Sequence, residues 1–116
     1  MAWMIGFQTI LMLAICLVSA CAKPTLPATA EEQNKAGETY ILCLRNAARA
    51  MDDHTSDAAS IATAIKPRCA AEFSRSTETF GRSLNPEARR MFEQDLAGMQ
   101  LEQATAVVLA EQAARR

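Results

Sequence analysis

The distribution of bulky apolar side chains is the feature that most limits how this 116-residue chain can fold. Of its 58 apolar residues, 17 lie in the first 21 positions. Residues 22–116 contain the other 41, but 20 of these are alanine, and leucine, isoleucine, valine and phenylalanine together number only 15. A remainder this short and this poor in large side chains suits one small domain without a deep active site or an enclosed cofactor pocket. We therefore expect no catalytic residues and no bound cofactor.

The first 22 residues have the character of an export signal. They carry no charged side chain, and residues 10–18 form an unbroken apolar run of nine. Nine residues fit the hydrophobic region of a secretory signal and are too few to cross a hydrocarbon layer of about 30 Å. Ala20 and Ala22 match the pattern for cleavage before Lys23. Because no Lys or Arg precedes the run, an uncleaved membrane anchor is a further interpretation, and each of these places the remaining chain outside the cytoplasm.

Val18-Ser19-Ala20-Cys21 resembles the lipobox of bacterial lipoproteins, in which a branched residue and two small ones precede a cysteine. The resemblance implies that residues 1–20 are a signal peptide, that lipidation occurs on Cys21, and that the lipid holds the protein at a membrane. More than one acyl chain is enough for stable anchoring. Ala22 stands where an aspartate favours inner-membrane retention in enterobacterial relatives, so the outer membrane is slightly favoured. We expect a location in the bacterial cell envelope, membrane-anchored and facing the periplasm.

The remainder is predicted to be a tether followed by an all-α domain. Residues 21–30 contain two prolines and no helical periodicity, which predicts an extended tether after the lipidation site. Residues 31–116 are predicted to form three helices, at about 31–52, 57–81 and 86–115, and no segment alternates as a strand would. The expected apolar faces are Tyr40, Cys43, Leu44, Ala47 and Met51 in the first helix, Ala58, Ile61, Ile65, Cys69, Phe73 and Phe80 in the second, and Ala88, Met91, Phe92, Leu96, Met99, Ala106 and Ala110 in the third.

The ends and the interior of these helices carry further signals. Thr55 or Ser56 can cap the start of the second helix, and Asn85 can cap the third. Gly81 suits a C-cap of the second helix. Pro67 lies inside that helix, where it removes a backbone donor and clashes with the preceding turn, so we expect a kink near residues 63–66.

Cys43 and Cys69 form an even pair in a chain that we expect to be exported, where disulfides persist. In an antiparallel helical hairpin, facing residues lie equally far from the turn, and the midpoint of these two is residue 56. This position falls within the polar segment 52–57, which the helix pattern marks as a turn without reference to the cysteines. We therefore predict a disulfide between Cys43 and Cys69 that staples an antiparallel helical hairpin, with the long third helix packed on it.

Two other groups of residues could carry chemistry. His54 with its neighbouring aspartates could be drawn as a metal site, but the same residues suit a solvated, capping turn, and the chain has no second histidine. We expect no metal. Arg68, Arg75 and Arg82 recur every seven residues and could contact lipid headgroups or an acidic partner, or form an ordinary solvated face.

The third helix also has apolar residues beyond its main face, which could form a partner face or wrap the other helices. These residues are Leu101, Val107, Val108 and Leu109.

The spacing Tyr40-x-x-Cys43 with Cys69-x-x-Glu72 is similar to that of many short, exported, uncharacterised proteins of proteobacteria, a resemblance that implies no activity. A net charge of −1 argues against nucleic-acid binding. We therefore expect a binding or structural lipoprotein, an accessory or adaptor to a membrane or periplasmic protein partner, with no small-molecule substrate. The alternative is a soluble periplasmic helical protein, cleaved before Lys23, that acts as a binding or inhibitor module.

Overall fold

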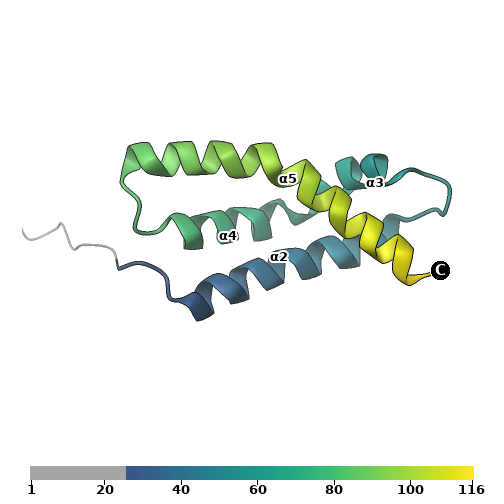
Figure 1. The fold of residues 1–116 in the computed structure, drawn as a ribbon, viewed down its shortest axis with the longest axis horizontal. Helices are drawn as coiled ribbons and strands as arrows, with labels where there is room; N and C mark the ends of the chain where they lie inside the picture. Colours follow the sequence, from purple (N-terminus) through teal and green to yellow (C-terminus); the bar gives the residue numbers. More distant parts are fainter. Residues whose placement is uncertain (1–25) are drawn as a thin grey trace, which may run out of the picture.

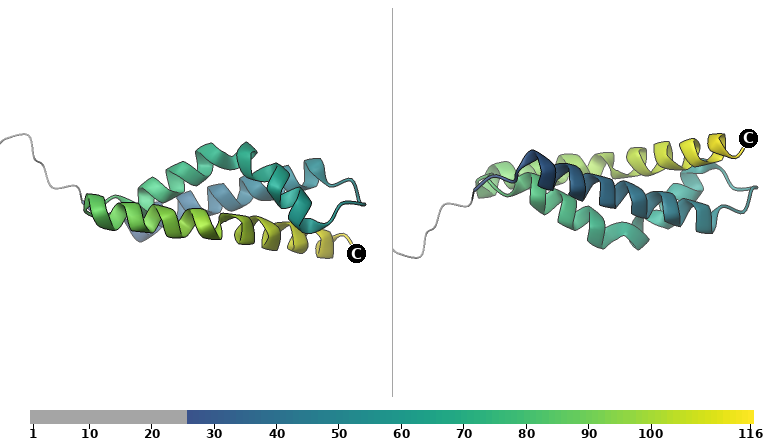
Figure 2. Two further views of the ribbon diagram at one scale, coloured as in Figure 1. Left: turned by 90° about the horizontal axis from the view of Figure 1, so that it is seen from above. Right: turned by 90° about the horizontal axis from the view of Figure 1, so that it is seen from below.

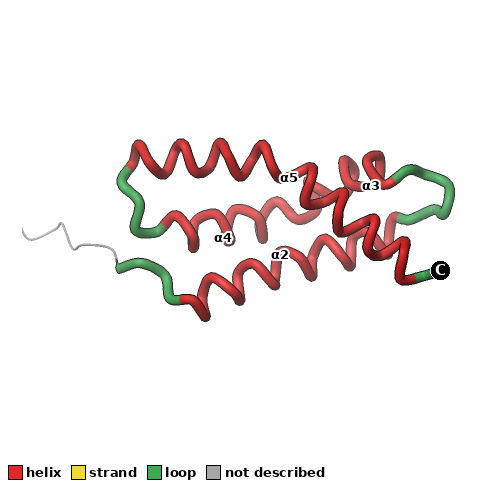
Figure 3. Tube along the Cα trace, in the orientation of Figure 1, coloured by secondary structure: helices red, strands yellow, loops and turns green. Residues whose placement is uncertain are grey.

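The computed structural model describes residues 26–116, so the predicted leader, Cys21 and most of the predicted tether lie outside the described residues. Residues 26–29 have no regular secondary structure. The helices that follow are α2 (Ala30–Met51), α3 (Ala58–Ile65), the short 3₁₀ helix η2 (Lys66–Cys69), α4 (Ala70–Gly81) and α5 (Pro86–Ala114). Figure 3 shows that the described chain consists of helices and loops without strands. The all-α prediction is confirmed, with the second predicted helix divided into α3, η2 and α4.

Side chains cap the start of the two longest helices. Thr29 and Glu32 form a reciprocal capping box at α2: the Glu32 N–H donates to the Thr29 hydroxyl at 3.2 Å, and the Thr29 N–H donates to the Glu32 carboxylate at 2.8 Å. Asn85 caps α5 as predicted, because its side-chain oxygen accepts a hydrogen bond from the Ala88 N–H at 2.9 Å.

The cap predicted for the second helix was wrong by one or two residues. Asp57, and neither Thr55 nor Ser56, is the N-cap of α3, and it accepts a hydrogen bond from the Ser60 N–H at 3.0 Å. The physical reason lies in the preceding turn, where the N–H groups of Thr55 and Ser56 donate to the side chain of Asp53. These two residues are therefore held within the turn and cannot begin the helix.

The C-cap prediction for Gly81 was also wrong. Gly81 is the last residue of α4, and no glycine among the described residues has a positive φ. A Cβ at this position would lie 3.5 Å from the ring of Phe92, an ordinary van der Waals contact, so the packing of Phe92 does not require a glycine here.

The kink predicted from Pro67 is present. α3 ends at Ile65, and the next four residues form η2, with Pro67 near its start, where a missing N–H breaks no helical hydrogen bond. The left view of Figure 2 shows the arm from α3 to α4 bending at this point. The break therefore begins at the C-terminal edge of the expected range, residues 63–66, and extends beyond it.

The helices form an antiparallel hairpin with a third helix laid across it. α2 forms one arm, and α3, η2 and α4 form the other (Figure 1). The loop at residues 52–57 lies at the same end of the molecule as the C-terminus, whereas the turn at residues 82–85 lies at the end where residue 26 enters (Figure 1). α5 runs back from that turn beside α4 and then crosses α2 and α3. It packs closely on α2 and α3 and only sparingly on α4.

The core is small and lies toward the loop end. Four of its ten buried apolar residues are alanines, as expected from the composition, and Leu44, Ile65, Val108 and Cys69 are the largest that are fully buried. The buried set is Tyr40, Leu44, Ala48, Ala58, Ile61, Ala62, Ile65, Cys69, Ala104 and Val108. The first two predicted faces are largely confirmed, although Phe80 is 41% exposed.

The apolar face predicted for α5 was only partly correct. Phe92 and Leu96 are partly buried, but Met91 and Met99 are 62% and 49% exposed, and Ala106 and Ala110 are exposed. The residues that are at least partly buried in the second half of the helix are Gln100, Gln103, Ala104, Thr105, Val107, Val108, Glu111 and Gln112.

The prediction failed because it counted apolar residues alone, whereas the packed face of α5 includes polar ones. Glu111 is only 13% exposed at its side chain, and it forms ion pairs with Arg49, at 2.7 Å, and Arg45, at 3.6 Å. These partners come from α2, so their positions could be known only once α5 was placed across α2. The pKa of Arg49 is raised by its hydrogen bond to Glu111.

Candidate functional site

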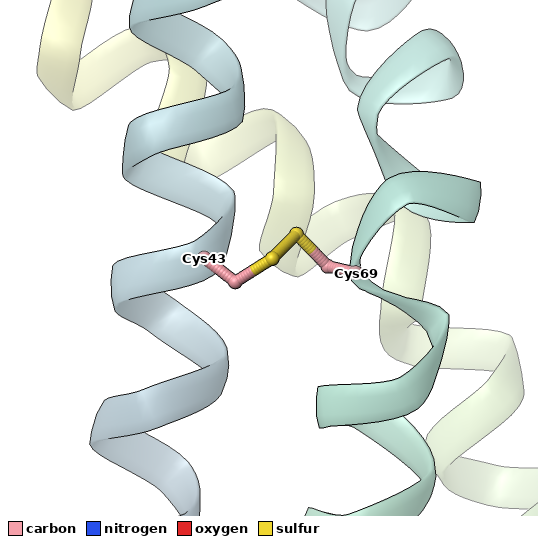
Figure 4. Close-up of a disulfide and its surroundings, with 2 residues drawn as sticks. All are labelled: Cys43 and Cys69. Atoms are coloured by element: carbon pink, nitrogen blue, oxygen red, sulfur yellow. A yellow bond between two sulfur atoms is a disulfide. The ribbon is translucent and has the colours of Figure 1, made fainter.

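The disulfide predicted between Cys43 and Cys69 is present (Figure 4). The two sulfur atoms are 2.08 Å apart, and the Cα atoms are 5.9 Å apart. Cys43 lies in the middle of α2, and Cys69 is the buried last residue of η2. The bridge therefore ties α2 to the place where the second arm is irregular. Because both thiols are consumed, neither can act as a nucleophile or a metal ligand in this state.

The loop at residues 52–57, which we call the acidic turn, uses its carboxylates to hold its own backbone in place. Asp53 accepts hydrogen bonds from the N–H groups of Ser56, at 2.7 Å, and Thr55, at 2.9 Å, and from the Ser56 hydroxyl at 2.7 Å. These bonds hold the pKa of Asp53 well below its usual range, and the bond from the Ser56 N–H has the largest effect. The hydroxyl and N–H of Ser60 lower the pKa of Asp57 in the same way.

Asp52 and His54 anchor the end of α5. The Asp52 side chain is 2% exposed, accepts a hydrogen bond from the His54 N–H at 2.8 Å, and forms an ion pair with Arg115. Arg115 also lies 3.2 Å from Nδ1 of His54, whose backbone has a φ of 62°. Within residues 26–116, no three His, Cys, Asp or Glu side chains are grouped so that they could bind a metal. The arrangement joins the C-terminus of α5 to the end of α2.

The three arginines of the predicted basic strip have different surroundings. Arg82 forms an ion pair with Glu32 of α2, at 3.0 Å, and Arg75 lines the same shallow groove between α2 and α4. The bond to the Thr29 backbone and the pairing with Arg82 lower the pKa of Glu32. Arg68 lies in η2 and does not line that groove. The break in the helix thus separates Arg68 from the other two.

The sequence analysis did not find an apolar groove that lies between α2, α4 and α5. Its volume is about 320 Å³, and its aromatic lining consists of Tyr40, Phe73, Phe80 and Phe92. We call this cavity the aromatic groove. These four are the only tyrosine of the chain and every phenylalanine after the leader, a concentration that composition alone could have signalled. The helical pattern assigned them to three separate faces, and only the packing of the helices brings them together.

Comparisons with models of protein families, with curated proteins and with solved structures found no match to this chain. Among the described helices, none is both long enough and apolar enough to cross a membrane.

Proposed function

We propose that this protein is a small lipoprotein of the bacterial cell envelope that acts outside the cytoplasm as an adaptor or accessory to a protein partner. The observation that carries the proposal is the disulfide between Cys43 and Cys69. Disulfides of this kind persist in oxidising compartments and are rare in the cytosol. The lipobox at residues 18–21 supplies the anchor, and the two prolines of residues 21–30 keep the domain at a distance from the membrane surface.

The described side chains favour binding over catalysis. The carboxylates of the acidic turn are engaged in hydrogen bonds and an ion pair, and the two cysteines are joined. In contrast, α5 exposes several large apolar side chains that make no part of the core: Met91 at 62%, Met99 at 49%, Leu101 at 41% and Leu109 at 54%. α5 thus carries four of the eight large apolar side chains that are exposed among the described residues, and this concentration is why we assign the partner surface to α5.

The anchor is tested by metabolic labelling with a radioactive fatty acid, followed by the intact mass of the protein purified from membranes. We expect label and added mass on an N-terminal Cys21. Cys21→Ser should abolish both, whereas Cys16→Ser, which changes another cysteine of the same leader, should retain them. An unlabelled soluble protein that begins at Lys23 would contradict the lipoprotein and leave the periplasmic binding module in its place.

The partner surface is tested by photo-crosslinking in living cells. A crosslinking residue at position 109, on the exposed side of α5, should capture one envelope protein reproducibly. The matched control is position 46 of α2, where Asn46 is also exposed. Equal capture at both positions, or capture at neither, would argue against α5 as the partner surface.

A further inference from the structure

The aromatic groove is elongated along the helices. α4 contributes residues from Phe73 to Phe80, and α5 contributes residues from Phe92 to Gln103. At 1.5 Å per residue, these stretches extend for about 10 Å and about 16 Å. The groove exists because α5 packs closely on α2 and α3 but only sparingly on α4. A cavity with this shape fits a linear molecule that lies parallel to the helices.

The lining is mostly apolar, and its polar side chains besides Tyr40 are those of Ser76, Thr77 and Gln103. Ile41 and Leu96 complete the aromatic wall, and none of the lining side chains is charged at neutral pH. An ionised ligand group would lose its hydration here without gaining a partner of opposite charge. The ligand that this lining favours is therefore uncharged where it enters the groove, with a long apolar body.

One residue of the lining carries a buried polar group that lacks a partner. Tyr40 is 4% exposed, its ring packs against Phe73 with 5.4 Å between centroids, and its hydroxyl makes no hydrogen bond within the described residues. Burial raises the pKa of Tyr40, and the side chain of Gln100 offsets part of the rise without reaching hydrogen-bond geometry. By contrast, the Thr77 hydroxyl in the same groove donates to the Phe73 carbonyl at 2.9 Å. A buried donor without an acceptor costs free energy that a ligand acceptor would recover.

We propose that the aromatic groove binds a single uncharged acyl chain, an ester or amide of a fatty acid, with the Tyr40 hydroxyl donating a hydrogen bond to its carbonyl oxygen. In this arrangement the acyl chain extends from Tyr40 past Phe92 toward Phe80, which lies near the turn at residues 82–85. Residue 26 enters at this same end of the molecule (Figure 1), so an anchor in the preceding residues would turn this end of the groove toward lipid. Only that last point rests on the proposed anchor, because the lining and the orphaned hydroxyl are independent of it.

The probe is a homologous series of straight-chain 1-monoacylglycerols, titrated calorimetrically below their micelle concentrations. The protein is the full chain with Cys21→Ser, which cannot carry an acyl group at that position. Each added methylene should tighten the Kd about fourfold until the chain fills the groove, after which the Kd should level off. No binding, or tightening with no plateau, would overturn the proposal, the latter because it indicates adsorption to exposed apolar surface.

Two glycines offer a matched pair of variants. Gly37 lines the groove, and a Cβ built there would meet no atom within 4 Å; the same space surrounds Gly98, which lies on α5 outside the groove. Gly37→Leu should fill the cavity and weaken binding at least tenfold, whereas Gly98→Leu should bind as the parent does. Both changes favour the helix, so thermal melting should show folded proteins. Unchanged binding by Gly37→Leu would place the ligand elsewhere and overturn the assignment.

The role of the hydroxyl is tested with Tyr40→Phe and with 1-alkylglycerol ethers, which lack the carbonyl. Tyr40→Phe should bind the ester about 2- to 12-fold more weakly than the parent does, and it should bind the ether as tightly as the parent does. Equal loss for both ligands, or no loss for the ester, would overturn the hydrogen bond.

Since Tyr40 is the only tyrosine, a protein labelled at tyrosine gives one ring signal by NMR, which should shift on binding. Loss of binding in this protein and loss of fatty-acid label at Cys21 are separate readouts, so the groove and the anchor can fail independently.

Discussion

Reduction of the disulfide should remove a large part of the stability of this domain. The bridge joins residues 26 positions apart, and the chain-entropy model for a loop of this length gives a loss of about 3.5 kcal/mol at 25 °C. Reduction leaves both sulfur atoms in the core, so the packing of Cys69 and its neighbours is retained. A domain of this size shifts by roughly 4–8 °C per kcal/mol, so the Tm should fall by about 14–28 °C.

The assay is thermal melting followed by circular dichroism, in a protein with Cys16→Ser and Cys21→Ser so that reductant acts on one bridge alone. The control is the same protein with Cys43→Ala and Cys69→Ala. It should be insensitive to reductant and melt slightly below the reduced protein, because it also loses the buried sulfur atoms. An oxidised and a reduced protein that melt at the same temperature would refute the reasoning that a thin, alanine-rich core depends on the bridge.

Three further predictions concern single residues. Leu44→Ala empties the centre of the core and should cost about 2–5 kcal/mol in urea unfolding, whereas Leu109→Ala, at a side chain that is 54% exposed, should leave the free energy of unfolding nearly unchanged. Asn85→Ala removes the cap of α5 and should cost about 1 kcal/mol in the same assay, with the exposed Ser83→Ala in the same turn as its control. Tyr40 should titrate above its usual value of about 10 in the folded protein and return to it in denaturant, as followed by ultraviolet absorbance. The stability that neutral Tyr40 contributes is fully present below its pKa in the unfolded protein and is lost as the pH rises through its pKa in the folded protein. If Tyr40 titrates at its usual pKa in the folded protein, the result would contradict its burial.

Local signals predicted much of the fold. The helical spacing of Tyr40 and Leu44 identified the buried face of α2, and Asn85 before Pro86 marked the start of α5. The disulfide was predictable because two constraints coincided: a polar turn halfway between Cys43 and Cys69, and periodic apolar residues around both. Helix periodicity and turn chemistry act over a few residues, so they can be read without knowledge of distant contacts.

The parts that failed depend on partners distant in sequence. The inward face of α5 is decided by where that helix crosses α2, because Glu111 is acceptable on a packed surface only when arginines of α2 meet it there. The aromatic groove has the same origin, since no one helix contains it and its residues meet only when α5 separates from α4. The sequence alone therefore determined the helices, their main turn and the bridge. The tertiary structure alone decided which side of α5 is buried and that Tyr40 meets Phe92 across a groove, because an Ala-rich helix with polar residues all around lacks one dominant apolar face to orient it.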